Sequence, residues 1–275
     1  MIIYILNQLK FEYYIKTIIL YIYNMNIVDK VTATRNTIKD ILTEEWDTSS
    51  IADLTTSEVE KMYSLPSSKV NSLTPFGVAT GCNFTLKHKS IPSYRLHIIY
   101  YNLPEIGRLN SKVTKSACEK LNRLYQEGIV NKEDSLFVIV NDAISESLEE
   151  SFYDLNVNLQ TSFEMMELNE NIVDEMKESG HVLGKKHFRN VHIFDINSLT
   201  NNILNHRLVP NHRPIRKKDE INKVLDKCNC LINQLPVINK NDIISKLIRL
   251  APGDVCEITR QSVKCGEYSF YRVCK

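Results

Sequence analysis

Three short apolar segments, separated by helical patterns, limit the fold more than any other feature of this sequence. Residues 94–102, 135–142 and 191–196 are rich in β-branched and aromatic side chains, as strands are. Between the first two, residues 111–128 have helical spacing and end at Gly128, a residue type that favours helix ends. Strands that alternate with helices indicate an α/β domain with a small mixed or parallel sheet.

The chain before these strands predicts two helices. Residues 26–46 carry apolar side chains at mostly helical spacing. Thr55 stands three residues before Glu58, which is the signature of a capping box at the start of a short helix. We therefore assign residues 26–200 to one α/β domain.

The first 25 residues form an apolar and aromatic segment that Lys10, Glu12 and Lys16 interrupt. A membrane span needs about 20 mostly apolar residues with few charges, so these three side chains argue against one. No small-residue cleavage site follows, as a secretory signal requires. We treat residues 1–25 as an extension of doubtful status, with Met25 as the functional start, and expect no membrane contact. A membrane anchor and a peripheral amphipathic helix are the alternatives.

The last part of the chain, residues 201–275, has a different pattern. Its helices and strands are expected at residues 217–227, 240–249, 254–260 and 267–274. Gly266 supplies the turn between the two strands. The pattern predicts a small α+β module with two short helices and a C-terminal β-hairpin.

Charge divides the chain at the same place. Residues 201–275 hold 14 Lys and Arg against 7 Asp and Glu, a net of +7, whereas residues 1–200 hold 20 against 26, a net of −6. Within the acidic part, residues 142–178 carry eleven acids and one base, Lys177, which is typical of a solvated helical face. The basic module suits an acidic protein partner or nucleic acid.

Four side chains of the module, His206, His212, Cys228 and Cys230, are of the types that zinc prefers. Their spacing differs from that of zinc sites, because a single residue separates the cysteines. The alternative is two small, partly buried thiols in a reducing compartment. The sequence has no nucleotide-binding or hydrolase motif either. We predict no catalytic residue, no metal and no cofactor.

Ordered motifs in the module point to a family. The module carries "HRLVPNH" at 206–212, "QLP" at 234–236 and "RQSVKCGEYSFYR" at 260–272. In this order they resemble the fifth subunit of multi-subunit DNA-directed RNA polymerases, a family whose archaeal members consist of this module alone. The positions that match the family's motifs are His206, Leu208, Val209, Pro210, His212, Gln234, Leu235, Pro236, Asp242, Gly253, Arg260, Ser262, Gly266, Tyr268, Tyr271 and Arg272. The resemblance implies that these residues form a subunit interface.

Four positions depart from the family's motifs. Ile243 stands where the family has a proline, Arg249 where a glycine ends a helix, Pro252 where a basic residue precedes the turn glycine, and Lys264 where a threonine occurs. The resemblance to the family is therefore weakest at these four positions, and the local helix and turn geometry there is the least certain to follow the family.

The resemblance implies a non-catalytic polymerase subunit, with phosphodiester chemistry and its magnesium in other subunits. In this family the C-terminal module docks on the largest subunit, and a jaw-like N-terminal domain lies beside downstream duplex DNA. Residues 26–200 match the longer, eukaryotic form only in layout. Since no base-reading motif is present, we expect sequence-independent DNA contact and predict Lys87, Lys89, Arg108 and Lys112 near the DNA.

The composition bears on the source. Asn and Ile make up about 20% of the chain, which is typical of an A/T-rich genome. With its divergent N-terminal half, the chain resembles subunits encoded by large cytoplasmic DNA viruses. That origin predicts the viral factory in the host cytoplasm and the virion, whereas a cellular subunit belongs in the nucleus.

Two details of geometry follow from the sequence. Tyr268 and Tyr271 have opposite parity on the last strand, so they are expected on opposite faces, and that strand pair can add its edge to a partner sheet. Pro210 restricts the residue before it to extended conformations, which predicts an extended linker over residues 208–210. His206 and His212 then pack or form hydrogen bonds.

Two other functions stay open. A stand-alone nucleic-acid-binding protein would use the basic module and bind DNA with a steep salt dependence. A redox or metal-binding α/β enzyme would use Cys228 and Cys230, and metal analysis of the purified protein distinguishes it.

Overall fold

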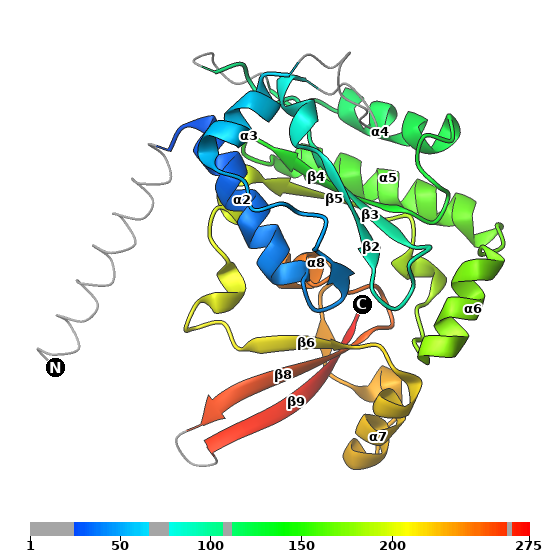
Figure 1. Cartoon of the computed structure of the whole chain (residues 1–275). Helices are drawn as coiled ribbons and strands as arrows, with labels where there is room; N and C mark the ends of the chain where they lie inside the picture. Colours follow the sequence, from blue (N-terminus) through cyan, green and yellow to red (C-terminus); the bar gives the residue numbers. More distant parts are fainter. Residues whose placement is uncertain (1–24, 66–76, 107–111, 263–265) are drawn as a thin grey trace, which may run out of the picture.

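The computed structural model describes residues 25–65, 77–106, 112–262 and 266–275. They contain two sheets, one in each part of the chain (Figure 1). We call residues 26–200 the N-terminal unit and residues 201–275 the C-terminal module. Among the described helices, none is long and apolar enough to cross a membrane.

The N-terminal unit is built on a five-stranded sheet in the order β1-β2-β3-β4-β5. Its strands are β1 (Trp46–Asp47), β2 (Phe84–His88), β3 (Arg95–Tyr100), β4 (Ser135–Val140) and β5 (Val191–Asp195). β1, β2 and β3 pair antiparallel, whereas β3, β4 and β5 pair parallel. The predicted mixed α/β sheet is confirmed. The two antiparallel strands at one edge, β1 and β2, are not expected from the sequence.

Helices cover both faces of this sheet (Figure 1). They are α2 (Ile27–Leu42) and α3 (Thr56–Tyr63) on one face and α4 (Ser116–Gln126) and α5 (Glu146–Glu164) on the other. The remaining helices of this unit are α6 (Glu170–Ser179), η2 (Val78–Cys82), η3 (Lys185–His187) and η4 (Ile196–Leu199). Ile98 packs under α2 and α3, and its neighbour Ile99 under α4 and α5. Strands buried on both faces are rich in apolar residues, which is why β3 and β4 are visible in the sequence.

The predicted capping box is present at the start of α3. The N–H of Thr55 donates to Glu58 Oε2 at 2.8 Å. The predicted helix over residues 26–46 is shorter than expected, because α2 ends at Leu42 and Trp46 opens β1.

The C-terminal module contains a four-stranded sheet in the order β6-β8-β9-β7. Its elements are η5 (Ile203–Asn205), β6 (Asn211–Ile215), α7 (Lys218–Cys228), η6 (Ile232–Gln234), β7 (Val237–Ile238), α8 (Ile243–Leu247), β8 (Val255–Ser262) and β9 (Gly266–Cys274). The predicted pair of short helices and the hairpin are confirmed. The hairpin projects beyond its neighbours, because β6 pairs with residues 255–259 and β7 with residues 273–274 (Figure 1).

The predicted extended linker over residues 208–210 is wrong. The chain turns here before β6 begins at Asn211: Val209 N donates to His206 O at 2.8 Å. The His206 ring stabilises the turn, since its Nδ1 accepts from Leu208 N at 3.3 Å. A side chain that bonds the backbone two residues ahead offers an alternative to extended structure.

Two departures from the family's motifs lie at a helix start and in a tight turn. Asp242 caps α8 by accepting from Ile244 N at 2.8 Å, so Ile243 takes the first helical position without a proline. Pro252 and Gly253 occupy the centre of a tight turn, in which Gly253 has a φ of +100°. Lys264 lies outside the described residues.

The two parts meet at a buried ionic junction centred on Arg216, the residue after β6. Its Nε donates to Glu45 Oε1 of the N-terminal unit at 2.7 Å, and its Nη1 donates to Asp254. Its Nη2 also donates to the carbonyl oxygens of Ile248 and Arg249, at 3.2 and 3.1 Å. Burial alone would raise the pKa of Asp254, but Arg216, His187 and the Ala251 N–H together outweigh it, and the pKa falls to about 2. One guanidinium thus neutralises the buried Asp254 and the partly buried Glu45, which lie in distant parts of the chain.

Arg249 extends this junction into the N-terminal unit. Its φ of +58° is a left-handed conformation, which costs a non-glycine residue about 1–2 kcal/mol. Its Nη2 donates to the Tyr94 hydroxyl at 3.1 Å, and its Nη1 lies 3.2 Å from His192 Nδ1. The arginine at this position, where the resemblance predicts a glycine, ties the module to the N-terminal unit at the expense of backbone strain.

Two buried histidines, His88 and His187, and the partly buried His192 surround the two arginines. Burial lowers the pKa of His88 to about 3, and it also lowers the pKa values of His187 and His192. Arg216 lowers the first two further, and Arg249 the last two. His187 Nδ1 lies 3.4 Å from an Asp254 oxygen, and this contact acts to raise the pKa of His187 but does not offset burial. All three rings are therefore neutral at neutral pH.

Candidate functional site

One face of the projecting hairpin carries two arginines and two aromatic rings. Tyr268, Phe270 and Arg272 alternate along β9, and Arg260 of β8 stands opposite Tyr268. The guanidinium groups of Arg260 and Arg272 lie 4.5 and 5.4 Å from the centroid of the Phe270 ring. The Tyr268 and Phe270 rings stack at 6.3 Å. We call these four residues the arginine–aromatic face.

Much of this face is open to solvent. Tyr268 is 43% exposed, and Arg260 is exposed as well. Arg272 is half-buried and donates from Nη1 to Val237 O at 2.9 Å. Guanidinium groups stacked on rings keep N–H donors in a fixed plane, which suits carboxylates and carbonyl oxygens of a partner.

His212 borders the arginine–aromatic face from β6, where it stands opposite Ile258. Its Nδ1 donates to Pro210 O at 2.7 Å, which leaves Nε2 as an acceptor. Burial lowers its pKa, although the hydrogen bond to Pro210 and the carboxylate of Asp242 act in the other direction. His212 is therefore neutral at neutral pH and adds an acceptor beside the arginine donors.

Tyr271 lies on the other face of the hairpin. Its hydroxyl donates to Glu257 Oε1 at 3.3 Å, and the Lys227 ammonium of α7 lies 5.7 Å from its ring centroid. The ring belongs to the apolar cluster between the sheet and α7. The prediction that Tyr268 and Tyr271 face opposite sides is confirmed, and Tyr271 packs the module.

The outer edge of β9 also lacks a neighbour along most of its length. Val273 N donates to Pro236 O at 2.9 Å, on the β7 side. Because strand residues alternate, the main-chain groups of Tyr271, Ser269 and Glu267 point to that same side. β7 pairs only with residues 273 and 274, so among the residues that the structure describes no strand covers the rest of this edge.

Several other matched residues stabilise the module itself. Gln234 closes the η6 turn, Leu235 is buried, and the carbonyl of Pro236 accepts from β9. Asp242 caps α8, and Gly253 holds a turn at positive φ.

The remaining residues that match the family's motifs lie in the turn before β6 and next to the tip of the β8–β9 hairpin. Residues 206–210 form the turn before β6, where Leu208 is 66% exposed. Ser262 and Gly266 form the pair nearest the hairpin tip. The matched set therefore divides into residues that hold the fold and residues that face outward.

The predicted DNA-proximal residues do not gather on one surface. Lys87 and Lys89 are exposed at the end of β2, where Lys87 stands opposite Arg95 at the start of β3. Lys112 is exposed beyond the other end of β3, before α4. Arg108 lies outside the described residues.

The four candidate zinc ligands do not converge on one point. His212 borders the arginine–aromatic face, whereas Cys230 packs against the α7 face of the same sheet. Cys228 is exposed at the end of α7. Across the described ranges of the chain, no three His, Cys, Asp or Glu side chains converge as a metal site requires.

Comparison with known proteins places this module in a family. Residues 201–274 match the family model "RNA polymerase Rpb5, C-terminal domain". The DNA-directed RNA polymerase subunit Rpo5 of Aeropyrum pernix is 41% identical over 70 residues, which are 26% of this chain and 77% of that protein. The Rpo5 subunits of Methanosphaera stadtmanae and Pyrococcus horikoshii are each 42% identical, over 91% and 87% of their lengths and 26% of this chain.

The chain belongs to the RNA polymerase Rpb5 family. The resemblance seen in the sequence is thereby confirmed for the C-terminal module. Rpb5 and Rpo5 are non-catalytic subunits of RNA polymerase, which agrees with the prediction of a chain without its own active site.

Sequence reasoning missed two parts of the Rpb5 module. Phe270 is the ring between both arginines, and its equal parity with Tyr268 and Arg272 could have indicated it. Arg216 holds the junction, but its partner Glu45 lies 171 residues away, and no sequence pattern links the two.

Proposed function

We propose that this Rpb5-family chain is a polymerase subunit whose C-terminal module docks on the largest subunit through the arginine–aromatic face and the free edge of β9. The main support for the proposal is that residues matching the family's motifs are also residues exposed on the hairpin. Arg260, Tyr268 and Arg272 match the family's motifs, and they are also the side chains that the hairpin presents outward.

The chemistry of this surface suits a protein partner. The N–H and C=O groups along β9 offer main-chain hydrogen bonds to an added strand, a mode that gives affinity without side-chain specificity. The arginines and Tyr268 supply specificity, because Arg and Tyr are enriched where interfaces hold most of their binding energy. A net charge of +7 over residues 201–275 favours an acidic partner surface.

Affinity purification of the tagged full chain from its source cells tests this proposal. We expect the two largest polymerase subunits to co-purify at moderate salt and to be identified by mass spectrometry. Recovery of the chain alone under those conditions contradicts the proposal.

The N-terminal unit would then lie beside downstream DNA and contact its phosphates. Lys87 and Lys89 form one exposed basic pair for this role, and Lys112 stands apart from it. Reversing the charges of Lys87 and Lys89 should weaken binding of the assembled polymerase to downstream duplex DNA and flatten its salt dependence. If assembly is lost instead, the two lysines are structural.

The arginine–aromatic face also supports a second function. Arginine and aromatic side chains together also stack on nucleic-acid bases, so a stand-alone nucleic-acid-binding protein is the alternative. It predicts that the purified chain binds duplex or single-stranded DNA alone, with affinity falling steeply as salt rises. The viral origin, with its localisation in a viral factory and virion, stays a prediction from composition.

A further inference from the structure

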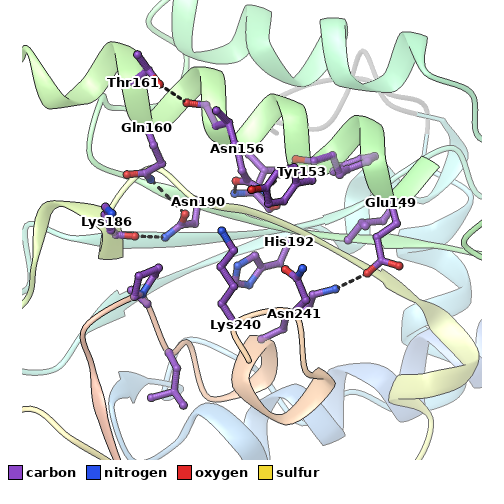
Figure 2. A pocket seen from close by; sticks show the side chains of 18 of the residues that line it. Glu149, Tyr153, Asn156, Gln160, Thr161, Lys186, Asn190, His192, Lys240 and Asn241 are labelled. Atoms are coloured by element: carbon purple, nitrogen blue, oxygen red, sulfur yellow. Dashed lines mark hydrogen bonds and ion pairs between the residues drawn. The ribbon is translucent and has the colours of Figure 1, made fainter. Parts of the chain in front are cut away.

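A cavity of about 280 Å³ lies between α5 and the segment around α8 (Figure 2). Its lining mixes two glutamates, Glu149 and Glu164, with three lysines, so it favours neither sign of charge. The main-chain groups of Val191 on the adjacent strand are already bonded by the Asn156 side chain, both at 2.7 Å. The cavity therefore selects no particular ligand. A cysteine pair at the end of α7 carries a more specific chemistry.

Cys228 and Cys230 stand on either side of Asn229, where α7 ends. Asn229 has a φ of +47° and a ψ of +49°, a left-handed conformation that asparagine adopts more readily than most residues. Its N–H donates to Asp226 O at 3.1 Å, and the N–H of Cys230 donates to Leu225 O at 3.2 Å. The chain therefore turns back over the last turn of α7 and does not separate the two cysteines in an extended segment.

The two thiols lie close enough to react with each other. Residues two apart in the sequence have Cα atoms separated by at most about 7 Å, and the turn at Asn229 shortens this span. Disulfides join Cα atoms that are about 4.4–6.8 Å apart. Burial raises the pKa of the Cys230 thiol, and the charge and hydrogen bonding of the neighbouring Cys228 thiol raise it further. The two sulfur atoms are therefore neighbours in the folded chain.

This pair differs from the buried cysteines in its access to solvent. Cys228 is exposed and Cys230 is partly exposed. Burial raises the pKa of Cys82 to about 11 and the pKa values of Cys256 and Cys274 to about 12. Since the thiolate is the reactive form of cysteine, these three thiols are protonated and inert at neutral pH. An oxidant in solution therefore reaches Cys228 before it reaches any of these three.

We propose that Cys228 and Cys230 form a reversible intramolecular disulfide by exchange with a low-molecular-weight disulfide such as oxidised glutathione. The Cys228 thiolate attacks one sulfur of oxidised glutathione, whose S–S bond breaks and releases one glutathione thiolate. The Cys230 thiolate then attacks Sγ of Cys228, closes the protein disulfide and expels the second glutathione. The two protons of the protein thiols pass to the two glutathione thiolates. The protein loses two electrons, and oxidised glutathione gains them.

The surroundings of Cys230 make this disulfide easy to reduce again. Cys230 packs with Leu225, Ile232 and Tyr271 in the apolar cluster between α7 and the sheet. Closing so small a ring draws the Cys230 side chain away from that cluster, and strained or exposed disulfides are the labile ones. The pair is therefore oxidised when the proportion of oxidised glutathione rises and returns to two thiols when it falls. The cluster lies on the sheet face opposite the arginine–aromatic face, so this chemistry is separate from the proposed docking.

The test follows the thiols of the full chain in buffers with a rising proportion of oxidised glutathione. Free thiols are alkylated with iodoacetamide, and trypsin then releases residues 228–240 as one peptide, because it cleaves after Lys227 and Lys240. Mass spectrometry should show this peptide changing from two alkylated cysteines to one internal disulfide, and dithiothreitol should restore both thiols. Alkylation of both cysteines in every buffer overturns the proposal.

Single variants separate the two steps of the exchange. Cys230→Ser should accumulate the mixed disulfide of Cys228 with glutathione. In the wild type this species should stay below about a tenth of the oxidised protein, because the neighbouring thiol acts at an effective concentration of about millimolar or more. Cys118→Ser, at a partly buried cysteine of the N-terminal unit, is the matched control and should behave like the wild type. If the wild type also stops at the mixed disulfide, or joins two chains instead, the two thiols do not act as a pair.

Discussion

The junction around Arg216 and the arginine–aromatic face of the hairpin use the same side-chain types with opposite outcomes. At the junction, one guanidinium satisfies Glu45 and Asp254 and is itself buried. On the hairpin, Arg260 stacks on Phe270 and keeps its donors in solvent. Polar groups that are paired inside the molecule stabilise it, whereas those left open are available to a partner.

The largest expected effect is at the junction. Arg216→Met should lower the free energy of unfolding by about 3–5 kcal/mol, because it leaves the buried Asp254 and the partly buried Glu45 without a counter-charge. Urea unfolding of the purified chain measures this. Arg260→Met is the matched control on the hairpin and should lower stability by less than about 1 kcal/mol. Similar losses in the two variants would remove the distinction between the two sites.

The buried histidines make the junction sensitive to acid. Their folded-state pKa values lie below the unfolded value of about 6.5, so the unfolded chain takes up protons first as the pH falls. The His88 contribution is fully present above about pH 6.5 and is lost as the pH falls toward 3, by up to about 1.4 kcal/mol per pH unit. The contributions of His187 and His192 are lost in the same direction.

Urea unfolding between pH 7 and pH 5 measures this slope. His88→Phe should reduce it, because the His88 ring is buried and its Nε2 has no partner among the described residues. Lys223→Gln, at an exposed position of α7, should leave it unchanged. Equal slopes in wild type and His88→Phe would contradict the assignment of a neutral buried ring.

A smaller effect separates backbone strain from contact at Arg249. Arg249→Ala loses the bonds to Tyr94 and His192 and keeps the left-handed backbone, whereas Arg249→Gly loses the bonds and removes the strain. The glycine variant should therefore be more stable than the alanine variant by about 1 kcal/mol in urea unfolding. If alanine is equally stable, the left-handed conformation carries no strain.

The sequence predicted those parts of the fold whose signal is local. β3 and β4 are apolar on both faces, and the hairpin is marked by its alternating side chains and Gly266. β6 escaped prediction because Pro214 stands within it, which edge strands tolerate but which disguises a strand in the sequence. β1 and β7 have two residues each, too few for any period.

The sequence also predicted only part of the candidate site. Motif matching found Arg260, Tyr268 and Arg272, but it did not distinguish them from matched residues that hold the fold, such as Leu235 and Gly253. Burial and hydrogen bonding make that distinction, and both depend on contacts across the sheet. The ion pair between Glu149 of α5 and Lys246 of α8 joins residues that are 97 positions apart, so no local pattern indicates it.

The most direct test of this account compares co-purification of a hairpin variant with that of the wild type. Tagged full chains carrying Arg260→Glu and Tyr268→Ala together should lose at least about tenfold in recovery of the largest polymerase subunit, because both side chains belong to the docking face. Their free energy of unfolding should stay within about 1 kcal/mol of the wild type. Undiminished recovery of the largest subunit by this stable variant would contradict the assignment of the arginine–aromatic face as the docking surface.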